Sequence, residues 1–417
     1  MREIKPIPSD QIDDFTDIFC DAYPGMNMVT AEEKKKIKER YAKTSQDTRR
    51  TLYGIYDNDA LLGGIILFDF KMNLFGHKVS AGGGGTLAVS LLHKKEHVAH
   101  DLMKFFFEHY RDNGSFLATL WPFRPDFYRQ MGCGYGSKIN QYKIKPSQLP
   151  KTEGKKHVRF LTGDDAPALL EFYNRMVDRR TGMIEETLQN LQTTFEVRDR
   201  WKWVGFFDGD RITGYMTFAF QRGLPTNFVD NKINILEMQW EDRRSLAGMM
   251  DFLRTQLDQI SLIVINTTDE DFHHFLNDPR NDTGSLVTAV YHESNVSGVG
   301  IMYRVLDTPA VFSTLGDHNF GGVDCKMKLN VKDSFLPQND CSLVVHFTGG
   351  KPSLQEAGSF DVEVTMDIAD FSSMLLGAVR FRSVYDYGRA EISDENRVGL
   401  VSRAFATEEK PACMTDF

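Results

Sequence analysis

The hydrophobic positions of this chain change their spacing several times, which predicts a succession of helices and strands. Apolar residues recur at helical spacing in residues 9–23 and again in residues 96–114. Between them, residues 51–70 hold two β-type runs separated by the turn residues 57–59, a combination typical of a hairpin. Further strands are expected at residues 84–89, 115–122 and 134–144, and a short helix at residues 124–131. The last of these strands is expected to close the sheet of a first α/β domain.

The same pattern begins again after a polar linker at residues 148–156. The segment that begins at Trp203 can be laid on the segment that begins at Leu52 with one constant offset. Farther along, residues 243–244 (Arg-Arg) fall on residues 94–95 (Lys-Lys), at the start of the matching helix. A hairpin, a strand and a basic helix start that match in order predict an internal duplication.

The pattern changes once more from about Pro309. Residues 323–337, 341–350 and 360–368 have the pattern of antiparallel strands, and helices are expected at residues 368–379 and 393–406. Strands followed by helices predict an α+β module. Just before this module, the strand at residues 298–307 is expected to return to the first domain.

Composition and charge exclude several classes of function. A chain of 417 residues predicts two or three domains, and its net charge of -9 argues against non-specific binding to nucleic acid. The five cysteines are scattered without a CxxC pair, so reduced thiols and no metal site are expected. The N-terminus lacks the apolar stretch of a signal peptide, and the apolar run near residues 61–70 is too short to span a bilayer. A cytoplasmic protein without membrane contact is expected.

The most informative stretch runs from Gly82 to Gly136. A glycine-rich strand leads into a helix whose start carries Lys94 and Lys95. Free N–H groups at a helix start, the helix dipole and two ammonium groups together favour an anion, such as the pyrophosphate of coenzyme A. The alternative is a solvated basic helix start without a ligand.

Three motifs carry a resemblance to a known family. They are Val89 followed by residues 93–95 (His-Lys-Lys), Tyr128 followed by Gly132 and Gly134, and an aromatic residue at position 417. In these motifs the chain resembles the GNAT acetyltransferases and, more narrowly, the enhanced intracellular survival (Eis) family. The resemblance implies an α/β fold of two tandem GNAT (acyl-CoA N-acyltransferase) mixed-sheet domains, followed by an α+β SCP2-like domain. The implied limits are residues 1–150, 151–307 and 308–417.

The resemblance also implies roles for individual residues. The backbone of Leu87, Ala88 and Val89 would pair with the pantetheine arm of acetyl-CoA, and Tyr128 would be the general acid. The free carboxylate of Phe417 would be the general base. Asp21 and Asp416 would line the amine pocket. The pyrophosphate would be held by His93, Lys94, Lys95, Glu96, His97 and Val98.

One position departs from the GNAT pattern, because His97 stands where the pyrophosphate loop has a glycine. Glycine lets the backbone approach a phosphate without a Cβ in the way. A histidine could remain there at negative φ, and its ring could then bind the phosphate. Alternatively, Glu96 and His97 crowd the pyrophosphate. The protein would then be a binding or regulatory protein with little turnover. A third reading makes the C-terminal module a carrier of apolar ligands.

The resemblance implies acetyl-CoA as co-substrate and a primary amine, of an aminoglycoside or a lysine, as acceptor. It further implies a homo-oligomer, a hexamer. In the second repeat, Asp242, Arg243 and Arg244 follow an acidic stretch, and no tyrosine motif comes after them. The second domain is therefore expected to be a non-catalytic partner that shapes the amine pocket.

Overall fold

The computed structural model describes residues 2–26, 28, 30–44, 47–198, 200–281, 283, 285–286, 289–355 and 358–417. The chain divides into two compact units. Unit 1 contains Met1–Gly136, Gly300–Pro411 and Phe417, and unit 2 contains Ser137–Val299 and Ala412–Asp416.

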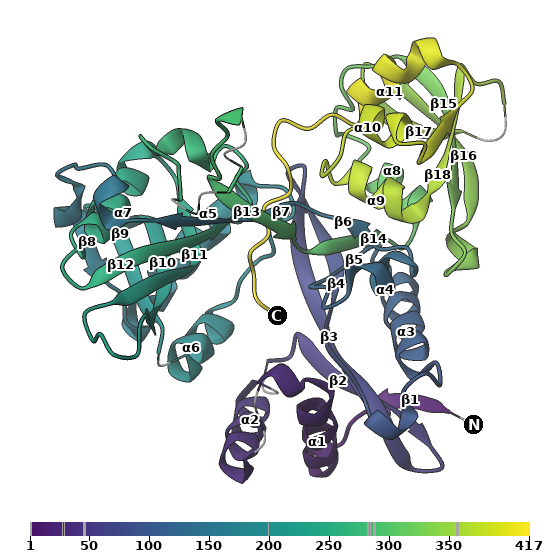
Figure 1. Cartoon of the computed structure of the whole chain (residues 1–417). Coiled ribbons are helices and arrows are strands. Elements are labelled where there is room, and N and C mark those ends of the chain that lie inside the picture. Colours follow the sequence, from purple (N-terminus) through teal and green to yellow (C-terminus); the bar gives the residue numbers. More distant parts are fainter. Residues whose placement is uncertain are drawn as a thin grey trace. The chain divides into compact units, whose positions relative to one another are not determined.

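The first sheet of unit 1 is mixed, with strand order β1-β2-β3-β4-β5-β14-β6 (Figure 1). Only the pair of β4 and β5 is parallel. The strands are β1 (Glu3–Pro6), β2 (Arg50–Asp57), β3 (Ala60–Leu74), β4 (His77–Val89), β5 (Leu117–Leu120), β6 (Gly134–Tyr135) and β14 (Met302–Val305). The predicted hairpin is confirmed as β2 and β3. Its turn residues Asn58 and Asp59 have φ of 46° and 67°, as a tight hairpin turn requires.

Helices cover both faces of this sheet. Successive residues of a strand point to opposite faces, and on β4 the buried Leu87 and Val89 pack in one core cluster while Ala88 packs in another. The first cluster contains α3 (Val98–Asp112), and the second contains α1 (Ile12–Ala22), beside α2 (Ala31–Thr44). The strand end that is expected to hold the cofactor is therefore enclosed on both sides.

Unit 2 holds a second seven-stranded sheet of order β13-β7-β12-β11-β10-β9-β8. Its strands are β7 (Lys138–Ile144), β8 (Val158–Phe160), β9 (Lys202–Asp208), β10 (Arg211–Arg222), β11 (Asn231–Trp240), β12 (Ile260–Thr267) and β13 (Asn295–Val299). Its helices are α5 (Ala166–Arg179), α6 (Leu188–Val197) and α7 (Arg243–Arg254). Read from β8, the order and the pairing directions repeat those of the first sheet, which confirms the duplication.

One strand of each repeat lies in a different sheet from its neighbours in sequence. Of the segment expected to close the first sheet, residues 134–144, only β6 (Gly134–Tyr135) does so. The remainder, Lys138–Ile144, forms β7 and pairs with β12 and β13 in unit 2, so this part of the prediction is wrong. Its counterpart β14 returns to the first sheet between β5 and β6, as expected for residues 298–307. Both strands occupy the sixth position of their sheet.

The third sheet belongs to unit 1 and has the order β17-β16-β15-β18-β19. Its strands are β15 (Cys325–Lys332), β16 (Cys341–Thr348), β17 (Lys351–Gln355), β18 (Val362–Asp367) and β19 (Ala390–Ile392). Its helices are α8 (Thr308–Thr314), α9 (Ile368–Leu375), α10 (Phe381–Asp386) and α11 (Val398–Ala404). The α+β prediction is confirmed, with one correction: β15 and β18 run parallel rather than antiparallel.

Candidate active site

Strands β4 and β5 separate at the end of β4. Their parallel pairing runs from Ala81 opposite Leu117 to Gly84 opposite Leu120 and then stops. In the next stretch Thr86 has a φ of 50° and the register with β3 shifts, which marks a bulge that bends β4 away. The β5-facing edge of residues 85–89 therefore has no strand partner in the described part of the chain. An extended ligand can pair with such an edge through its amide groups.

The predicted pantetheine residues Leu87, Ala88 and Val89 form this end of β4 and are buried. Tyr23, which the sequence analysis did not single out, donates a hydrogen bond from its hydroxyl to the Leu87 carbonyl oxygen at 2.7 Å. Burial raises the pKa of Tyr23 to about 12, so this hydroxyl remains a donor at neutral pH. The contact links the end of α1 to the proposed cofactor edge.

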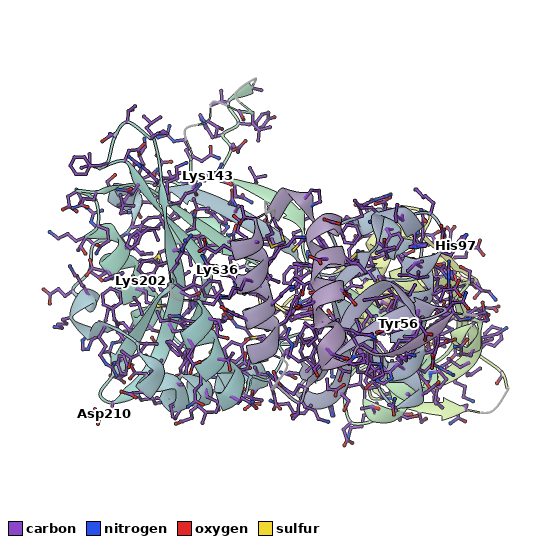
Figure 2. All side chains as sticks on the ribbon, turned by 90° about the horizontal axis from the view of Figure 1, so that it is seen from below. Lys36, Tyr56, His97, Lys143, Lys202 and Asp210 are labelled. Atoms are coloured by element: carbon purple, nitrogen blue, oxygen red, sulfur yellow. The ribbon has the colours of Figure 1, made fainter. Side chains whose placement is uncertain are left out.

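The predicted pyrophosphate loop follows directly and leads into α3. A 3₁₀ turn, η3 (Leu91–His93), precedes Lys95 and His97, which have φ of 67° and 63°. The condition set for His97, a negative φ, is therefore not met: the residue keeps the left-handed conformation that favours glycine. Its side chain is exposed (Figure 2) and does not cap α3, which leaves the first-turn N–H groups without a side-chain partner at the N-cap.

The charges of this loop are arranged so that its two ammonium groups stay available. Arg2 donates to the Glu96 carbonyl oxygen at 2.6 Å and lies 3.4 Å from its carboxylate. His93 Nδ1 lies 3.1 Å from the same carboxylate. In the part of the chain that the structure describes, exposed Lys94 and Lys95 have no ion-pair or hydrogen-bond partner. The loop therefore combines uncapped N–H groups with two cationic side chains, which suits a pyrophosphate.

Tyr128 lies in the short helix α4 (Pro125–Arg129) and is buried. Its ring contacts the rings of Phe123 and Phe127 with centroid distances of 5.5 and 5.2 Å. Tyr23 reaches the same cluster through Phe123, at 6.3 Å. Burial raises the pKa of Tyr128 well above its ordinary value, so its hydroxyl is protonated at neutral pH. Within the described residues this hydroxyl has no hydrogen-bond partner.

The C-terminal residue is anchored in unit 1. The Phe417 ring packs edge-on against Phe70 and Phe68, with centroid distances of 4.9 and 5.5 Å. A Cβ placed on Gly85 would lie 3.3 Å from the Phe417 carbonyl oxygen, so the end of the chain rests against the β4 backbone. Gly85 is the first residue after the β4–β5 pairing ends. Two predicted site elements, the carboxyl group of Phe417 and the free edge of β4, are thus brought together.

Asp21 and Asp416, the two predicted amine-pocket residues, belong to different units. Asp21 is exposed near the end of α1 in unit 1. Asp416 belongs to unit 2, where its carboxylate lies 2.6 Å from the Arg198 guanidinium. Their shared role stays a prediction.

Helix α7 of the second repeat begins differently from α3. Its N-cap Asp242 accepts a hydrogen bond from the Ser245 N–H at 2.9 Å in a capping box. The carboxylate thus occupies the place that an anionic ligand would take at the start of α7. At the corresponding point of unit 1, His97 offers no such cap.

Neither a metal site nor a membrane span emerges from the described residues. No three His, Cys, Asp or Glu side chains among them gather as metal ligands. Of the helices that the structure describes, none has the length and apolarity to cross a membrane.

Comparisons with known proteins agree with the fold described above. Two acetyltransferase (GNAT) domains match, at residues 3–136 and 176–305, and a sterol carrier protein domain matches residues 311–414. Comparison with curated protein sequences gives no match.

Several solved structures share the fold over the whole chain. A GCN5-related N-acetyltransferase from Anabaena variabilis has a TM-score of 0.82 at 14% identity, and Eis1 from Mycobacterium abscessus has 0.76 at 17%, each covering 100% of both chains. A GCN5-related N-acetyltransferase from Kribbella flavida has 0.79 at 15%, covering 100% of this chain and 98% of its own. The chain therefore consists of two tandem GNAT acetyltransferase domains followed by a sterol-carrier-like domain, and it shares the fold of Eis1 over its whole length.

Proposed function

We propose that the protein is an acetyl-CoA-dependent N-acetyltransferase that acetylates primary amines, with the active site in the first GNAT domain. The observation that carries this proposal is the position of the Phe417 carboxyl group against Gly85, at the start of the free β4 edge. A carboxylate at this place would lie beside a thioester whose pantetheine arm pairs with residues 87–89. A disordered chain end would have no such role.

The residues at the site fit acetyl-CoA as co-substrate. The β4 edge offers backbone groups to the pantetheine amides, and the start of α3 offers N–H groups to the pyrophosphate. Lys94 and Lys95 would add charge to the pyrophosphate contact. His97 keeps the loop in the glycine-type conformation, with a φ of 63°, although its Cβ narrows the approach of a phosphate to the backbone. Acetyl-CoA would supply the acetyl group as an activated thioester.

The two proton transfers of the reaction would then be carried out by the terminal carboxylate of Phe417 and the hydroxyl of Tyr128. A lysine-like amine has a pKa of about 10.4, so nearly all of it is protonated at pH 7 and must lose a proton before it attacks. The ring of Phe417 packs against Phe68 and Phe70, and its carboxylate, once desolvated by the bound cofactor, would hold the ammonium and accept this proton, directly or through water. As the carbon–sulfur bond breaks, the Tyr128 hydroxyl would donate its proton to the leaving thiolate.

The second GNAT domain would be a non-catalytic partner. The Asp242 carboxylate caps α7 and would repel a pyrophosphate there. Asp21 and Asp416 would hold the ammonium group of the acceptor, an aminoglycoside or a lysine side chain, and the protein would act as a homohexamer in the cytoplasm. The domain limits at residues 150 and 307 stay a prediction, and they would mark the repeats of the sequence rather than fragments that fold by themselves.

The test follows thiol release from acetyl-CoA by the purified full chain with an aminoglycoside, a polyamine or a lysine peptide. Tyr128→Phe is expected to lower kcat by about 10²- to 10⁴-fold, as the loss of a general acid does. One residue added after Phe417 is expected to lower kcat comparably, because it moves the carboxylate. Tyr135→Phe serves as a control for loss of a nearby tyrosine hydroxyl, since Tyr135 is exposed on β6.

Calorimetry with coenzyme A separates this proposal from its alternatives. Binding and amine-dependent turnover are expected together. Binding without turnover favours a regulatory protein, and absence of binding favours a carrier role of the third module. If both variants turn over as fast as the unmodified protein, the assignment of Tyr128 and Phe417 is wrong.

A further inference from the structure

Helix α9 of the third module lies against the part of the first sheet that follows Tyr128, since it contacts β6 and β14. The backbones approach so closely that a Cβ on Gly134 would overlap the Ala369 carbonyl oxygen. In addition, the Val305 N–H of β14 donates to the Ser372 hydroxyl of α9 at 2.9 Å. Every residue of α9 is buried, so the helix is held in place on all sides and can support the elements packed against it.

An ion-pair cluster connects α9 to α4. Arg129, the residue after Tyr128, places Nη2 2.6 Å from Asp370 Oδ2 on α9. Arg389 contacts the same oxygen from Nε and Nη2, at 3.2 and 3.0 Å. The side chains of Arg129 and Asp370 are only 17% and 12% exposed, so solvent screens their attraction less than that of a surface pair.

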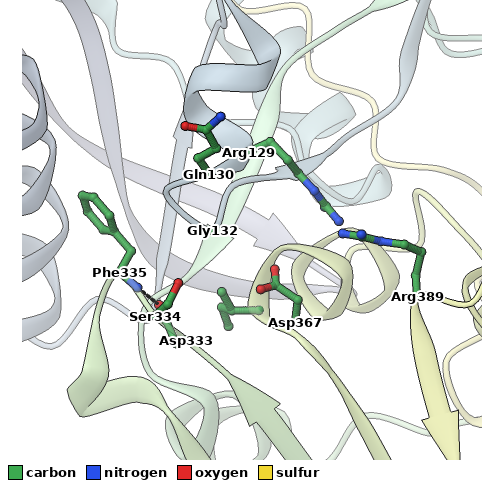
Figure 3. Close-up of a pocket in the computed structure, with 9 residues that line it drawn as sticks. Arg129, Gln130, Gly132, Asp333, Ser334, Phe335, Asp367 and Arg389 are labelled. Atoms are coloured by element: carbon green, nitrogen blue, oxygen red, sulfur yellow. Dashed lines mark hydrogen bonds between the residues drawn. The ribbon is translucent and has the colours of Figure 1, made fainter. Parts of the chain in front are cut away.

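Figure 3 shows Arg129 and Arg389 pointing toward one another. Both side chains line a cavity of about 230 Å³. Two guanidinium groups therefore share one carboxylate. Removing the charge of Asp370 would leave the two cations facing each other, which pushes α4 away from its place.

The turn after Tyr128 is held at a second point. Met131 N and Cys133 N both donate to the Tyr128 carbonyl oxygen, at 3.0 and 3.1 Å. Between them Gly132 has a φ of 81° and leaves no room for a Cβ beside the guanidinium of Arg304. Arg304 itself is fully buried and bound to Asp333, a residue of the third module, at 2.7 Å.

From these contacts we infer that Asp370 is a positioning residue for Tyr128, and that α9 of the sterol-carrier-like module supports the helix that carries the proposed general acid. The link to catalysis rests on the proposed function, whereas the support is a property of unit 1 alone. Among the described residues, the polar side-chain partners of Asp370 are Arg129 and Arg389, and neither belongs to the predicted cofactor contacts. Asp370 therefore acts on Tyr128 and not on cofactor affinity.

The support is tested by hydrogen exchange of the full chain with Asp370→Asn. Amides of residues 125–135 are expected to exchange at least tenfold faster than in the unmodified protein, while the strands of unit 2 exchange as before. The matched control is Glu363→Gln, which also turns a carboxylate of the third module into an amide and breaks its 2.8 Å ion pair with Lys328. Unchanged hydrogen exchange of residues 125–135 in Asp370→Asn would overturn the inference, whether or not kcat changes.

The catalytic link is tested by kinetics of the same variants. Asp370→Asn is expected to lower kcat about tenfold or more while the Kd of acetyl-CoA, measured by calorimetry, stays within twofold. Greater hydration of a loosened α4 brings the pKa of Tyr128 back toward 10, so the variant loses kcat above about pH 9 where the unmodified enzyme does not. Faster exchange with an unchanged kcat and pH profile would overturn the positioning role. If the unmodified protein shows no acetyl transfer, the proposed function is wrong. Hydrogen exchange alone then tests whether Asp370 of α9 holds α4 in place.

Discussion

Single residues of the loop between β4 and α3 adopt a backbone that their side chains disfavour. Lys95 and His97 have φ of 67° and 63°, although neither is glycine. A left-handed L-residue carries a steric cost of roughly 1–2 kcal/mol, somewhat less for residues such as histidine that are enriched there. Strain of this kind persists where the surroundings require the shape, and clusters at ligand sites. The loop keeps the shape of a phosphate-binding turn at the expense of stability.

Replacing His97 by glycine should relieve this strain. We expect His97→Gly to raise the free energy of unfolding by up to about 1 kcal/mol, because glycine adopts positive φ without a Cβ clash. The Kd of coenzyme A should fall as well, since the backbone becomes more accessible. Urea denaturation and calorimetry measure the two effects.

The control for His97→Gly is His100→Gly, inside α3. There glycine should lower the free energy of unfolding by roughly 0.3 kcal/mol, the difference in helix propensity between histidine and glycine. A His97→Gly protein that is destabilised like the control would show that the left-handed conformation is not strained.

Glu237 of unit 2 is a second residue with an unusual environment. Its Oε1 is buried without a hydrogen-bond partner among the described residues, and burial raises its pKa to about 7, with the nearby Glu186 and Asp416 carboxylates contributing. A carboxyl group whose folded pKa exceeds its unfolded value of about 4.5 favours folding when protonated. This contribution is present below about pH 4.5 and is lost as the pH rises through about 7.

Replacing the Glu237 carboxyl group by a neutral amide should therefore change the free energy of unfolding mainly at higher pH, where the carboxyl group is ionised. Relative to Glu237→Gln, the unmodified protein is expected to lose up to about 3 kcal/mol of unfolding free energy between pH 4.5 and 8.5. Differential scanning calorimetry of both proteins at these two pH values measures the change. A constant difference in Tm between them would mean that folding does not raise the pKa of Glu237.

The resemblance to the GNAT acetyltransferases indicated Leu87, Ala88 and Val89, and the structure places them at a free strand edge. Their pairing with pantetheine stays a prediction. Tyr23 and Arg2 were not predicted. Each contacts the site from a segment more than 60 residues away, through its side chain alone. Nothing local marks such a contact, because a helical tyrosine is most often a packing residue.

At the scale of elements, alternation revealed the strands but not always their partners. The β2–β3 hairpin was predicted correctly because its strands are joined by the two turn residues Asn58 and Asp59, so pairing and register are local. Strand β7 was predicted as a strand yet assigned to the wrong sheet, and β18 was given the wrong direction. A period of two identifies which side chains share a face, whereas the choice among distant edges depends on the complete core.

The exchanged strands predict how fragments of the chain behave. A fragment of residues 137–299 contains all seven strands of the second sheet, so we expect it to fold cooperatively by itself. Residues 1–150 should not fold by themselves. They lack β14, which joins β5 to β6, and they carry β7 without its partners. Circular dichroism and urea unfolding of both fragments test this, and a cooperative transition of the 1–150 fragment would contradict it.

At the scale of the whole molecule, the reactivity of the cysteines measures how often the folded chain opens, because most of them are buried. All five are free, and only Cys341 is partly exposed, while Cys20, Cys133, Cys325 and Cys413 are buried. Burial raises the pKa of Cys133 to about 12 and that of Cys413 to about 11. A thiol is a poor nucleophile until it ionises, so buried thiols of this kind react slowly.

We therefore expect Ellman's reagent to modify at most one thiol per chain within minutes under native conditions, with Cys341 first. In denaturant all five should react. A Cys341→Ser variant should remove the fast native reaction and leave four thiols in denaturant. Rapid reaction of several thiols in the native protein would show that the modules open frequently.

The placement of β7 in the second sheet and of β14 in the first indicates how such a chain can be shortened and how it could have arisen. Unit 2 begins and ends on paired strands, with Lys138 directly opposite Val299, and on the unit 1 side Gly136 N donates to Ile301 O at 2.9 Å. Excising residues 138–299 would therefore leave two adjacent ends that a few glycines can bridge. In its connectivity, the second GNAT domain is inserted between β6 and β14 of unit 1. Fusion of two gene copies, followed by the exchange of one strand between the two sheets, is sufficient to produce this connectivity.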